Sequence, residues 1–363
     1  MESIKFNLNP DFFQYQESKV IQTDSLSATL FRYKSGVCGV RLINSTGNIE
    51  LLTSQGQQIW KAHFEGRDLQ MKTFFEEPVQ TRDFLKNFGC FMLHCGALRV
   101  GSPSSGESHP LHGELPNAPY QNAWLVYGED NKEHYLSLCG RYEHREFFGA
   151  HYSAEPEVRL HENSSEIEIS MKIKNLSNKQ MELMYLCHIN FMPVNDSRIE
   201  YSTNYSPDTI KIRSAIPSHI KPDPGYIKLI DELKLYPELH HQVNKKLKAD
   251  PELVFYIDYS ADESGKCYTL QIHPDGKSDY VCHIKNQLPK AIRWISRTPD
   301  HDAIAIVEPA TCQVDGYHVE KEKGNVLILN PGDEFACDII AGALNVSRTN
   351  QVLKRIEQIR KSL

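Results

Sequence analysis

The cysteines of this chain lack the spacing of a metal or disulfide scaffold. There are nine of them, an odd number scattered between positions 38 and 337, and no two form a Cys-x-x-Cys pair. Such pairs are the usual ligands of a zinc ribbon, and small secreted domains carry an even number of cysteines at regular spacing. The cysteine pattern therefore argues against both and favours a reducing compartment.

Long apolar runs and an excess of basic residues are missing too. No stretch approaches the ~18 apolar residues of a helical membrane span. The first residues, "MESIKFNLNPDFFQYQ", do not show the basic and then apolar order of a signal peptide. The formal charge is −7, whereas nucleic acids and anionic membranes attract a basic surface. We therefore predict a cytoplasmic protein with neither a nucleic-acid nor a membrane partner.

Repeats, low-complexity segments and composition shifts are also absent, so we predict one domain over residues 1–363. What is present is a series of short strands. In residues 166–173, "EIEISMKI", apolar and polar side chains alternate, as in a strand with one buried face. Similar runs, separated by Gly, Pro, Asn and Asp, occupy residues 180–191, 267–273, 303–310 and 325–335. This pattern predicts an all-β protein built as a large antiparallel sandwich.

Two segments depart from the strand pattern. Residues 224–248, "PGYIKLIDELKLYPELHHQVNKKLK", indicate one or two helices interrupted at Pro237, because a proline inside a helix removes a donor and clashes with the preceding turn. Residues 347–363 form a second helical pattern, with an apolar stripe made of Val352, Ile356, Ile359 and Leu363. We expect Ser347 or Thr349 to cap this C-terminal helix, and the helix to pack across the sandwich.

The first group of candidate site residues lies in residues 109–120, "HPLHGELPNAPY". Its prolines exclude a helix or a central strand, because each fixes φ and removes a backbone donor. On this stiff loop, His109, His112 and Glu114 could bind a metal, transfer protons or simply occupy a turn. Surface histidines are most often only solvated, so the loop alone does not decide between these roles.

Two further candidates lie in apolar strands. His188 and Asn190 interrupt "YLCHINF", and Glu308 follows five apolar residues in "AIAIVE". His188 could be a core histidine bonded to a backbone carbonyl. A carboxylate at Glu308 carries a large desolvation cost unless it is paired or lies at a pocket, which fits either a structural ion pair or a functional site. Two histidines and a glutamate gathered from distant strands suit proton transfer, because imidazoles titrate near neutrality.

In their order and spacing, "LHGELPNAPY", "CHINF" and "IVEPAT" resemble the motifs of the galactose mutarotase-like proteins, the aldose 1-epimerases. The block "GCFMLHCGALRVG…HPLHGELPNAP", with "LPKAIRWISR" and "LILNPGDEF", is more similar still to a bacterial branch long catalogued as a domain of unknown function. The resemblance spans residues 30–345, most of the chain. It implies a galactose mutarotase-like β-supersandwich, here with a helical excursion near 224–248 and a C-terminal helix.

The resemblance also implies an isomerase that interconverts the α and β anomers of a sugar or sugar derivative. Glu308 is then the general base that takes the proton of the anomeric hydroxyl, and His188 is the general acid that protonates the ring oxygen. The ring opens to the aldehyde, rotates about C1–C2 and closes on the other face, while His112 polarises the sugar. Each such group contributes ~10²–10⁴-fold to the rate, which suffices without a cofactor or a metal.

The residues that hold the sugar follow less directly from the motifs. We expect Arg82, Asn190 and Trp294 to contact the substrate, although a tryptophan in a sandwich is often a core residue. Arg82 is the first candidate for the arginine, and Asp258 a weaker one for the aspartate, that bind sugar hydroxyls in better-known aldose 1-epimerases. The expected partner is thus a small carbohydrate, and the protein itself is expected to be a monomer or a homodimer.

Two other functions stay open at this point. A metal-dependent sugar isomerase of the cupin type would use His109, His112 and Glu114 as ligands, although the usual His-x-His spacing is absent. A non-catalytic carbohydrate-binding protein could have kept the fold and lost turnover. In the aldose 1-epimerase interpretation, Glu114 replaces a residue that is usually glycine and could enter the pocket, while His109 lies behind His112 or in solvent.

Overall fold

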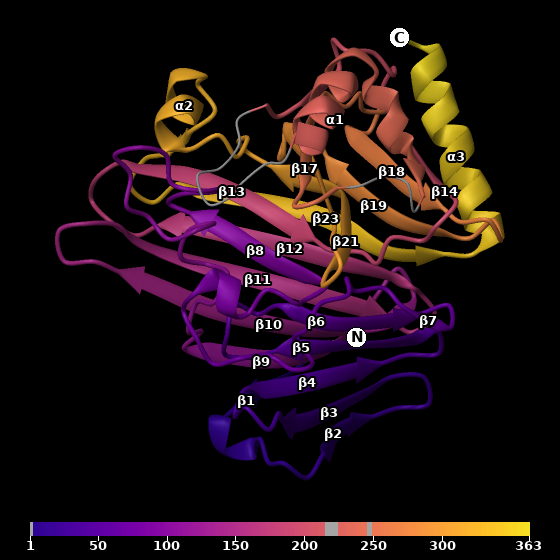
Figure 1. The fold of residues 1–363 in the computed structure, drawn as a ribbon. Helices are drawn as coiled ribbons and strands as arrows, with labels where there is room; N and C mark the ends of the chain where they lie inside the picture. The colour runs from indigo at the N-terminus through magenta and orange to yellow at the C-terminus, as the bar shows by residue number, and fades with distance from the viewer. Residues whose placement is uncertain (1–2, 215–223, 245–248) are drawn as a thin grey trace.

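The computed structural model describes residues 3–214, 224–244 and 249–363. Most of these residues form two antiparallel β-sheets that pack on each other through one continuous apolar core (Figure 1). The predicted all-β sandwich is therefore confirmed. The single-domain organisation stays a prediction.

The first sheet, called here the ten-stranded sheet, has the order β1-β9-β10-β11-β12-β23-β19-β18-β14-β16. Its strands are, in chain order, β1 Ile4–Leu8, β9 Asn122–Asp130, β10 Glu133–Arg145, β11 His151–His161, β12 Glu166–Asn175, β14 Ser197–Tyr201, β16 Gln242–Val243, β18 Lys266–Ile272, β19 Ser278–Ile284 and β23 Glu334–Leu344. β12 shows the predicted alternation, because its four apolar side chains at 167, 169, 171 and 173 are buried in the core between the sheets.

The second sheet, the 13-stranded sheet, has the order β15-β17-β20-β21-β13-β8-β6-β5-β4-β3-β2, with β22 beside β13 and β7 beside β6. Its strands are β2 Ser18–Gln22, β3 Ser27–Arg32, β4 Cys38–Ile43, β5 Gly47–Leu52, β6 Ile59–Phe64, β7 Arg67–Asp68, β8 Met92–Ala97, β13 Met181–Ile189, β15 Ile210–Ile212, β17 Leu253–Ile257, β20 Lys290–Arg297, β21 Asp302–Ala310 and β22 Leu327–Leu329. Strands far apart in the sequence, such as β8, β13 and β21, are neighbours in this sheet.

The 13-stranded sheet is buried on both of its faces near its centre. Along β13, Tyr185 and Cys187 point into the core between the sheets, whereas Met184 and Leu186 point the other way into a second apolar cluster. Loop residues on either side of β8, including Phe84 and Val100, complete this second cluster. Because side chains alternate along a strand, His188 shares the face of Met184 and Leu186, under those loops.

The helices are few. They are α1 Pro224–Leu235, α2 Tyr317–Glu322, α3 Val346–Lys361 and the 3-10 turns Pro10–Phe12, Phe84–Lys86 and Pro237–His241. The predicted interruption at Pro237 is confirmed, because α1 ends before this proline and a 3-10 helix begins at it. The last part of the predicted excursion, 245–248, lies outside the described residues. None of the helices in the described ranges is long and apolar enough to span a membrane.

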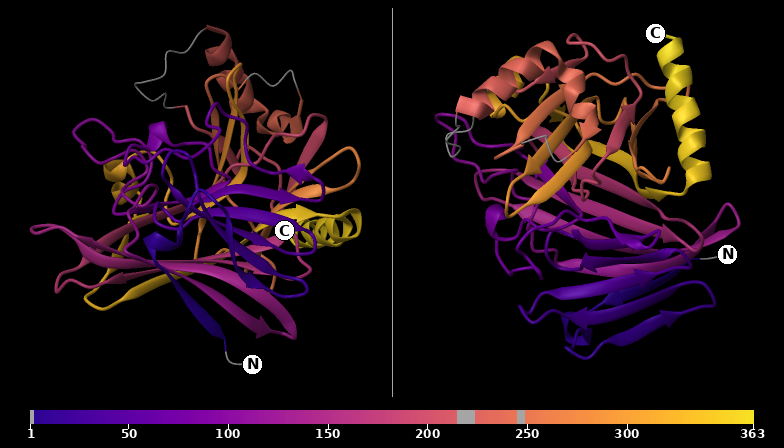
Figure 2. Two further views of the ribbon diagram at one scale, coloured as in Figure 1. Left: turned by 90° about the horizontal axis from the view of Figure 1, so that it is seen from below. Right: turned by 45° about the vertical axis from the view of Figure 1, so that its right-hand side comes forward.

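The C-terminal helix α3 covers part of the outer face of the ten-stranded sheet. In Figure 1 and in the right-hand view of Figure 2 it stands, in yellow, beside the strands of this sheet, and it contacts β14, β18 and β23. Val352 and Ile356 join an apolar cluster with Leu270 and Tyr280 of the sheet. The predicted packing of this helix across the sandwich is confirmed.

Two details of the C-terminal prediction are wrong. The cap is Asn345, whose side-chain oxygen accepts a hydrogen bond from the backbone N–H of Arg348 at 3.0 Å, so Ser347 and Thr349 lie inside the helix. Leu363 lies beyond the end of the helix and is 61% exposed. Several polar residues near the helix start are competent caps, and the sequence pattern does not choose between them.

Candidate active site

Strand register places His188 directly opposite Glu308. β13 and β21 are antiparallel neighbours with Leu186 paired to Ala310. In an antiparallel pair the numbering runs in opposite directions, so His188, two residues after Leu186, faces Glu308, two residues before Ala310. Nδ1 of His188 lies 3.1 Å from Oε1 of Glu308, and the two side chains are 5% and 3% exposed. A bulge where β21 pairs with β20 changes the local twist, a device that often re-aims side chains at functional sites.

The His188–Glu308 pair is buried and incompletely hydrogen-bonded. The angles between Nδ1 and Oε1 are not those of a hydrogen bond, and neither atom has a hydrogen-bond partner among the described residues. Burial, with a smaller effect from the charge of Glu252, raises the pKa of the Glu308 carboxyl well above its usual value. Burial, with a smaller effect from His112, lowers the pKa of His188 well below 6.5. The low-dielectric setting thus favours neutral forms of both groups.

His112 approaches this pair from the loop after β8. Its imidazole lies 5.6 Å from that of His188, between ring centroids, and its Nδ1 is buried without a hydrogen-bond partner among the described residues. Burial, followed by the charges of Arg213 and His109, lowers the pKa of His112 to about 4. His112 is therefore a neutral imidazole at neutral pH, able to donate one hydrogen bond and accept another.

The backbone of the loop explains why a glycine follows His112. His112 has a left-handed φ of 59°, a conformation in which histidine is enriched among non-glycine residues, and Gly113 has a φ of 82°. A Cβ on Gly113 would lie 2.3 Å from the carbonyl oxygen of Arg99 and 2.5 Å from that of Gly96. The N–H of Gly96 donates to the carbonyl of His112 at 2.9 Å. This close approach fixes His112 against the end of β8.

Aromatic rings wall the pocket around the three proton-handling residues. Phe88 lies 5.2 Å from His188 and 5.7 Å from Trp294, and Phe84 lies 4.9 Å from His112, all between ring centroids. The cavity has a volume of about 190 Å³. The other described residues that line it are Leu85, Gly101, Ser102, Leu111, Arg213, Glu252, Val254, Ile292, Glu308 and Val314. A mainly apolar pocket with a few convergent polar groups is the usual form of a small-molecule site.

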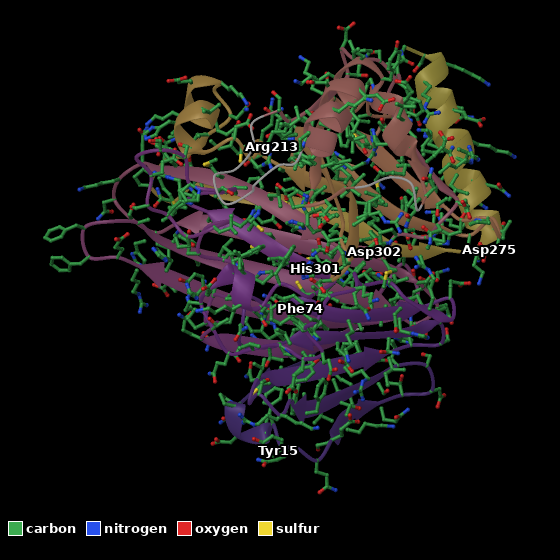
Figure 3. All side chains as sticks on the ribbon, viewed as in Figure 1. Tyr15, Phe74, Arg213, Asp275, His301 and Asp302 are labelled. Atoms are coloured by element: carbon green, nitrogen blue, oxygen red, sulfur yellow. The ribbon has the colours of Figure 1, made fainter. Side chains whose placement is uncertain are left out.

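Two charged residues of this pocket were not found from the sequence. Arg213 follows β15, and Glu252 precedes β17, which pairs with β15. Nη2 of Arg213 lies 2.5 Å from Oε1 of Glu252, and Nε1 of Trp294 donates to Oε2 of Glu252 at 2.7 Å. In Figure 3, Arg213 is seen between α1 and α2, far from the labelled Tyr15 of the β2 edge. Both residues stand beside ordinary strand sequences, and no motif marks them.

Of the residues expected to contact a sugar, only Trp294 lines this pocket. Arg82 is directed elsewhere: its guanidinium donates to the carbonyls of Asn117 and Glu114 at 2.6 and 3.2 Å, bracing the loop that carries His112. Asn190 is fully buried, and its Nδ2 donates to the carbonyl of Cys90 at 3.1 Å. Its amide raises the pKa of His188 against the larger effect of burial.

The remaining candidates turn away from the pocket. The side chain of Asp258 is 74% exposed and faces Lys285. His109 bonds to the carbonyl of Pro110 and approaches Glu107. Oε1 of Glu114 accepts hydrogen bonds from the backbone N–H groups of Ala97 and Leu98 and from the hydroxyl of Tyr152, so this carboxyl does not line the cavity.

The donor set of a cupin-type metal centre is not assembled here. The loop residues His109, His112 and Glu114 each face different partners. Across the described ranges, no three His, Cys, Asp or Glu side chains converge as metal ligands would. A metal site needs such convergence, with further groups orienting the ligands. What the arrangement provides is an acid–base pair and a third imidazole in one pocket.

Comparison with known proteins identifies the fold. Residues 34–341 match the family model of a domain of unknown function (DUF4432). No curated protein matches the chain. A solved structure from Klebsiella pneumoniae subsp. pneumoniae, provisionally named an aldose 1-epimerase, has a TM-score of 0.81 at 17% identity, with 99% of this chain and 96% of that chain covered.

Two further solved structures are similar over most of their length. A galactose mutarotase-like protein from Clostridium acetobutylicum has a TM-score of 0.61 at 11% identity, with 89% of this chain and 100% of that chain covered. A galactose mutarotase related enzyme from Lactobacillus acidophilus has a TM-score of 0.53 at 13% identity, with 85% and 98% covered. At these identities the likeness shows the fold alone, and the predicted galactose mutarotase-like fold is confirmed.

Proposed function

The chain belongs to the DUF4432 family, and from the chemistry of its pocket we propose that it is an aldose 1-epimerase, an enzyme that interconverts the α and β anomers of a sugar. The observation that carries this proposal is the His188–Glu308 pair. Its facing atoms lie 3.1 Å apart and lack hydrogen-bond partners among the described residues. Buried polar atoms without partners are costly, and a bound substrate with hydroxyl groups would satisfy them.

The two groups suit a reaction in which one proton is removed and another is delivered. Ionised Glu308 takes the proton of the anomeric hydroxyl as protonated His188 gives its proton to the ring oxygen, and the C1–O5 bond breaks to leave the aldehyde. After rotation about C1–C2, Glu308 returns its proton to the aldehyde oxygen while His188 takes the proton of the O5 hydroxyl. The ring has closed on the other face, and the pair again carries one proton.

The pKa shifts fit this cycle. Burial raises the pKa of Glu308 and lowers that of His188, so in the empty pocket the shared proton is favoured on the carboxyl. This is the protonation state reached after ring opening, and it is competent for ring closure. A polar substrate that stabilises the charged forms favours return of the proton to His188, and its hydroxyl groups can carry the proton between Oε1 and Nδ1, which lie 3.1 Å apart without hydrogen-bond alignment.

The other residues act by holding the sugar or the two catalytic groups. Neutral His112 donates a hydrogen bond to an oxygen near the anomeric centre, and Trp294 offers an apolar face for the ring. Asn190 orients His188 through its amide rather than by touching the substrate. Arg82 keeps the His112 loop in place through the carbonyls that it binds.

The test is acceleration of mutarotation, followed by polarimetry or saturation-transfer NMR on freshly dissolved single anomers of a panel of aldoses. Glu308→Gln and His188→Asn should each lower kcat by about 10²–10⁴-fold, the usual contribution of one acid–base group. Matched controls are Glu334→Gln and His63→Asn, which alter exposed or half-exposed strand residues and should leave the rate unchanged. If no aldose is accelerated, or if either catalytic variant keeps full activity, the proposal fails.

A further inference from the structure

The charges inside the pocket bear on which sugars can enter it. Arg213 is the single cationic residue among the described residues that line the cavity, whereas Glu252 and Glu308 supply two carboxyl groups. The guanidinium is already paired, since its Nη2 lies 2.5 Å from Oε1 of Glu252. Among the described lining residues, therefore, no positive charge is left uncompensated.

The Arg213–Glu252 ion pair is largely buried in the side of the pocket and is held by further hydrogen bonds. The two side chains are only 12% and 21% exposed. The backbone N–H of Arg213 donates to the carbonyl of Val254 at 2.8 Å, which extends the pairing of β15 with β17. Oε2 of Glu252 accepts from Nε1 of Trp294 at 2.7 Å. Both oxygens of Glu252 are thus occupied, and the pair is held in one geometry.

A paired arginine still has hydrogen-bonding capacity. A guanidinium carries five N–H donors, and the contact with Glu252 uses a part of them. The free donors can bind the oxygen of a neutral hydroxyl without moving the pair. A phosphate or sulfonate instead needs net positive charge, because its desolvation cost is large and the neutral Arg213–Glu252 pair offers it no net attraction.

We propose that this pocket selects uncharged aldoses and rejects aldoses that carry a phosphate, sulfonate or carboxylate group, because Glu252 neutralises the arginine of the pocket. The inference rests on the proposed aldose 1-epimerase activity and defines its substrate class. Discrimination of this kind comes from the uncompensated desolvation of the rejected group as much as from attractive contacts.

The first test compares matched substrates on the wild-type protein. For each pair, such as glucose and glucose 6-phosphate or galactose and galactose 6-phosphate, kcat/KM for mutarotation is measured under one set of conditions. For any sugar that is turned over, the neutral member should be preferred by about tenfold or more, because the charged group loses its hydration without gaining an unpaired cation in return. Equal or better turnover of the phosphate would overturn the inference and leave the proposed function standing. Absence of turnover with every aldose would overturn the proposed function itself.

The second test changes the pairing. Glu252→Gln removes one negative charge and frees Arg213, so the ratio of phosphosugar to neutral sugar in kcat/KM should rise by about tenfold or more. Arg213→Met removes the cation and should move the same ratio in the opposite direction. Because both members of a substrate pair depend equally on the catalytic groups, general damage to catalysis cancels in the ratio. The exposed Glu334→Gln serves as control and should leave the ratio unchanged.

These variants are informative even when one is unstable. Thermal unfolding of each variant shows whether it is folded before the ratios are compared. If Glu252→Gln does not fold, the wild-type ratio and the Arg213→Met ratio still decide the inference. A folded Glu252→Gln protein with the wild-type ratio would show that this pair does not set the selectivity.

Discussion

Glu114 offers a test of how the His112 loop is held, because its carboxyl joins three parts of the fold. Oε1 of Glu114 accepts from the N–H groups of Ala97 and Leu98 at the end of β8, at 3.0 and 3.1 Å, and from the hydroxyl of Tyr152 on β11 of the other sheet. Burial raises the pKa of this carboxyl. The three hydrogen bonds to Oε1 act against this effect of burial, because each donor favours the ionised form.

Glu114→Ala should lower the free energy of unfolding by about 3–5 kcal/mol. It leaves three buried donors without an acceptor, each at a cost of roughly 1–3 kcal/mol, and water entering the vacated space recovers a part of that sum. Glu114→Gln keeps an acceptor oxygen for the three donors in a side chain of the same shape, so its effect should be within about 1 kcal/mol. Tyr152→Phe removes one donor and should cost about 1 kcal/mol.

Urea unfolding followed by circular dichroism measures these differences. The pH dependence gives an independent check. Because the folded-state pKa of Glu114 is raised, the stability contribution of its protonated form is complete below the unfolded-state pKa and is lost as pH rises through the folded-state pKa. Glu114→Gln cannot ionise and lacks this loss, so its free energy of unfolding should rise relative to that of the wild type as pH rises. Equal stability of the Ala and Gln variants would refute the reasoning about the three donors.

The other predictions concern the pH profile and the C-terminal helix. Arg213 lowers the pKa of Glu308, so in Arg213→Met the alkaline limb of kcat/KM against pH should move to higher pH. An unchanged limb would show that ionisation of Glu308 does not produce it. Ile356→Ala should lower the free energy of unfolding by about 2–4 kcal/mol through a cavity under α3, whereas the exposed Glu357→Ala should change it by less than about 0.5 kcal/mol. Asn345→Ala should cost about 1 kcal/mol through loss of the cap, a difference that the same urea titrations resolve.

The sequence was sufficient for much of the fold because its signals are local. The alternation in residues 166–173 became β12, with its apolar side chains in the core. Pro237 interrupted the helical excursion as its missing N–H requires. The cap of α3 was misassigned because Asn345, Ser347 and Thr349 are all competent caps. The choice depends on the residue at which β23 ends, which is Leu344, directly before Asn345.

The candidate site was predicted unevenly for a physical reason. His188 and Glu308 were recognisable as polar residues in apolar strands, where burial without a partner is costly. His112 was recognisable by its proline-rich loop and the glycine beside it. Arg213 and Glu252 left no such signal, because charged residues next to strand ends are ordinary on a protein surface. Arg82 was assigned to the sugar, but the structure directs it to the loop carbonyls.

The sequence by itself determined which residues are apolar, where strands alternate, where the chain must turn and which side chains can transfer protons. Only the tertiary structure decided which of them meet. The register of β13 on β21 sets His188 opposite Glu308, and the pairing of β15 with β17 sets Arg213 beside Glu252. A one-residue shift in either register would turn one side chain of the pair to the other face of the sheet. The loop "HPLHGELPNAPY" follows the same rule, since His112 reaches the pair while Glu114, two residues on, anchors the loop to both sheets.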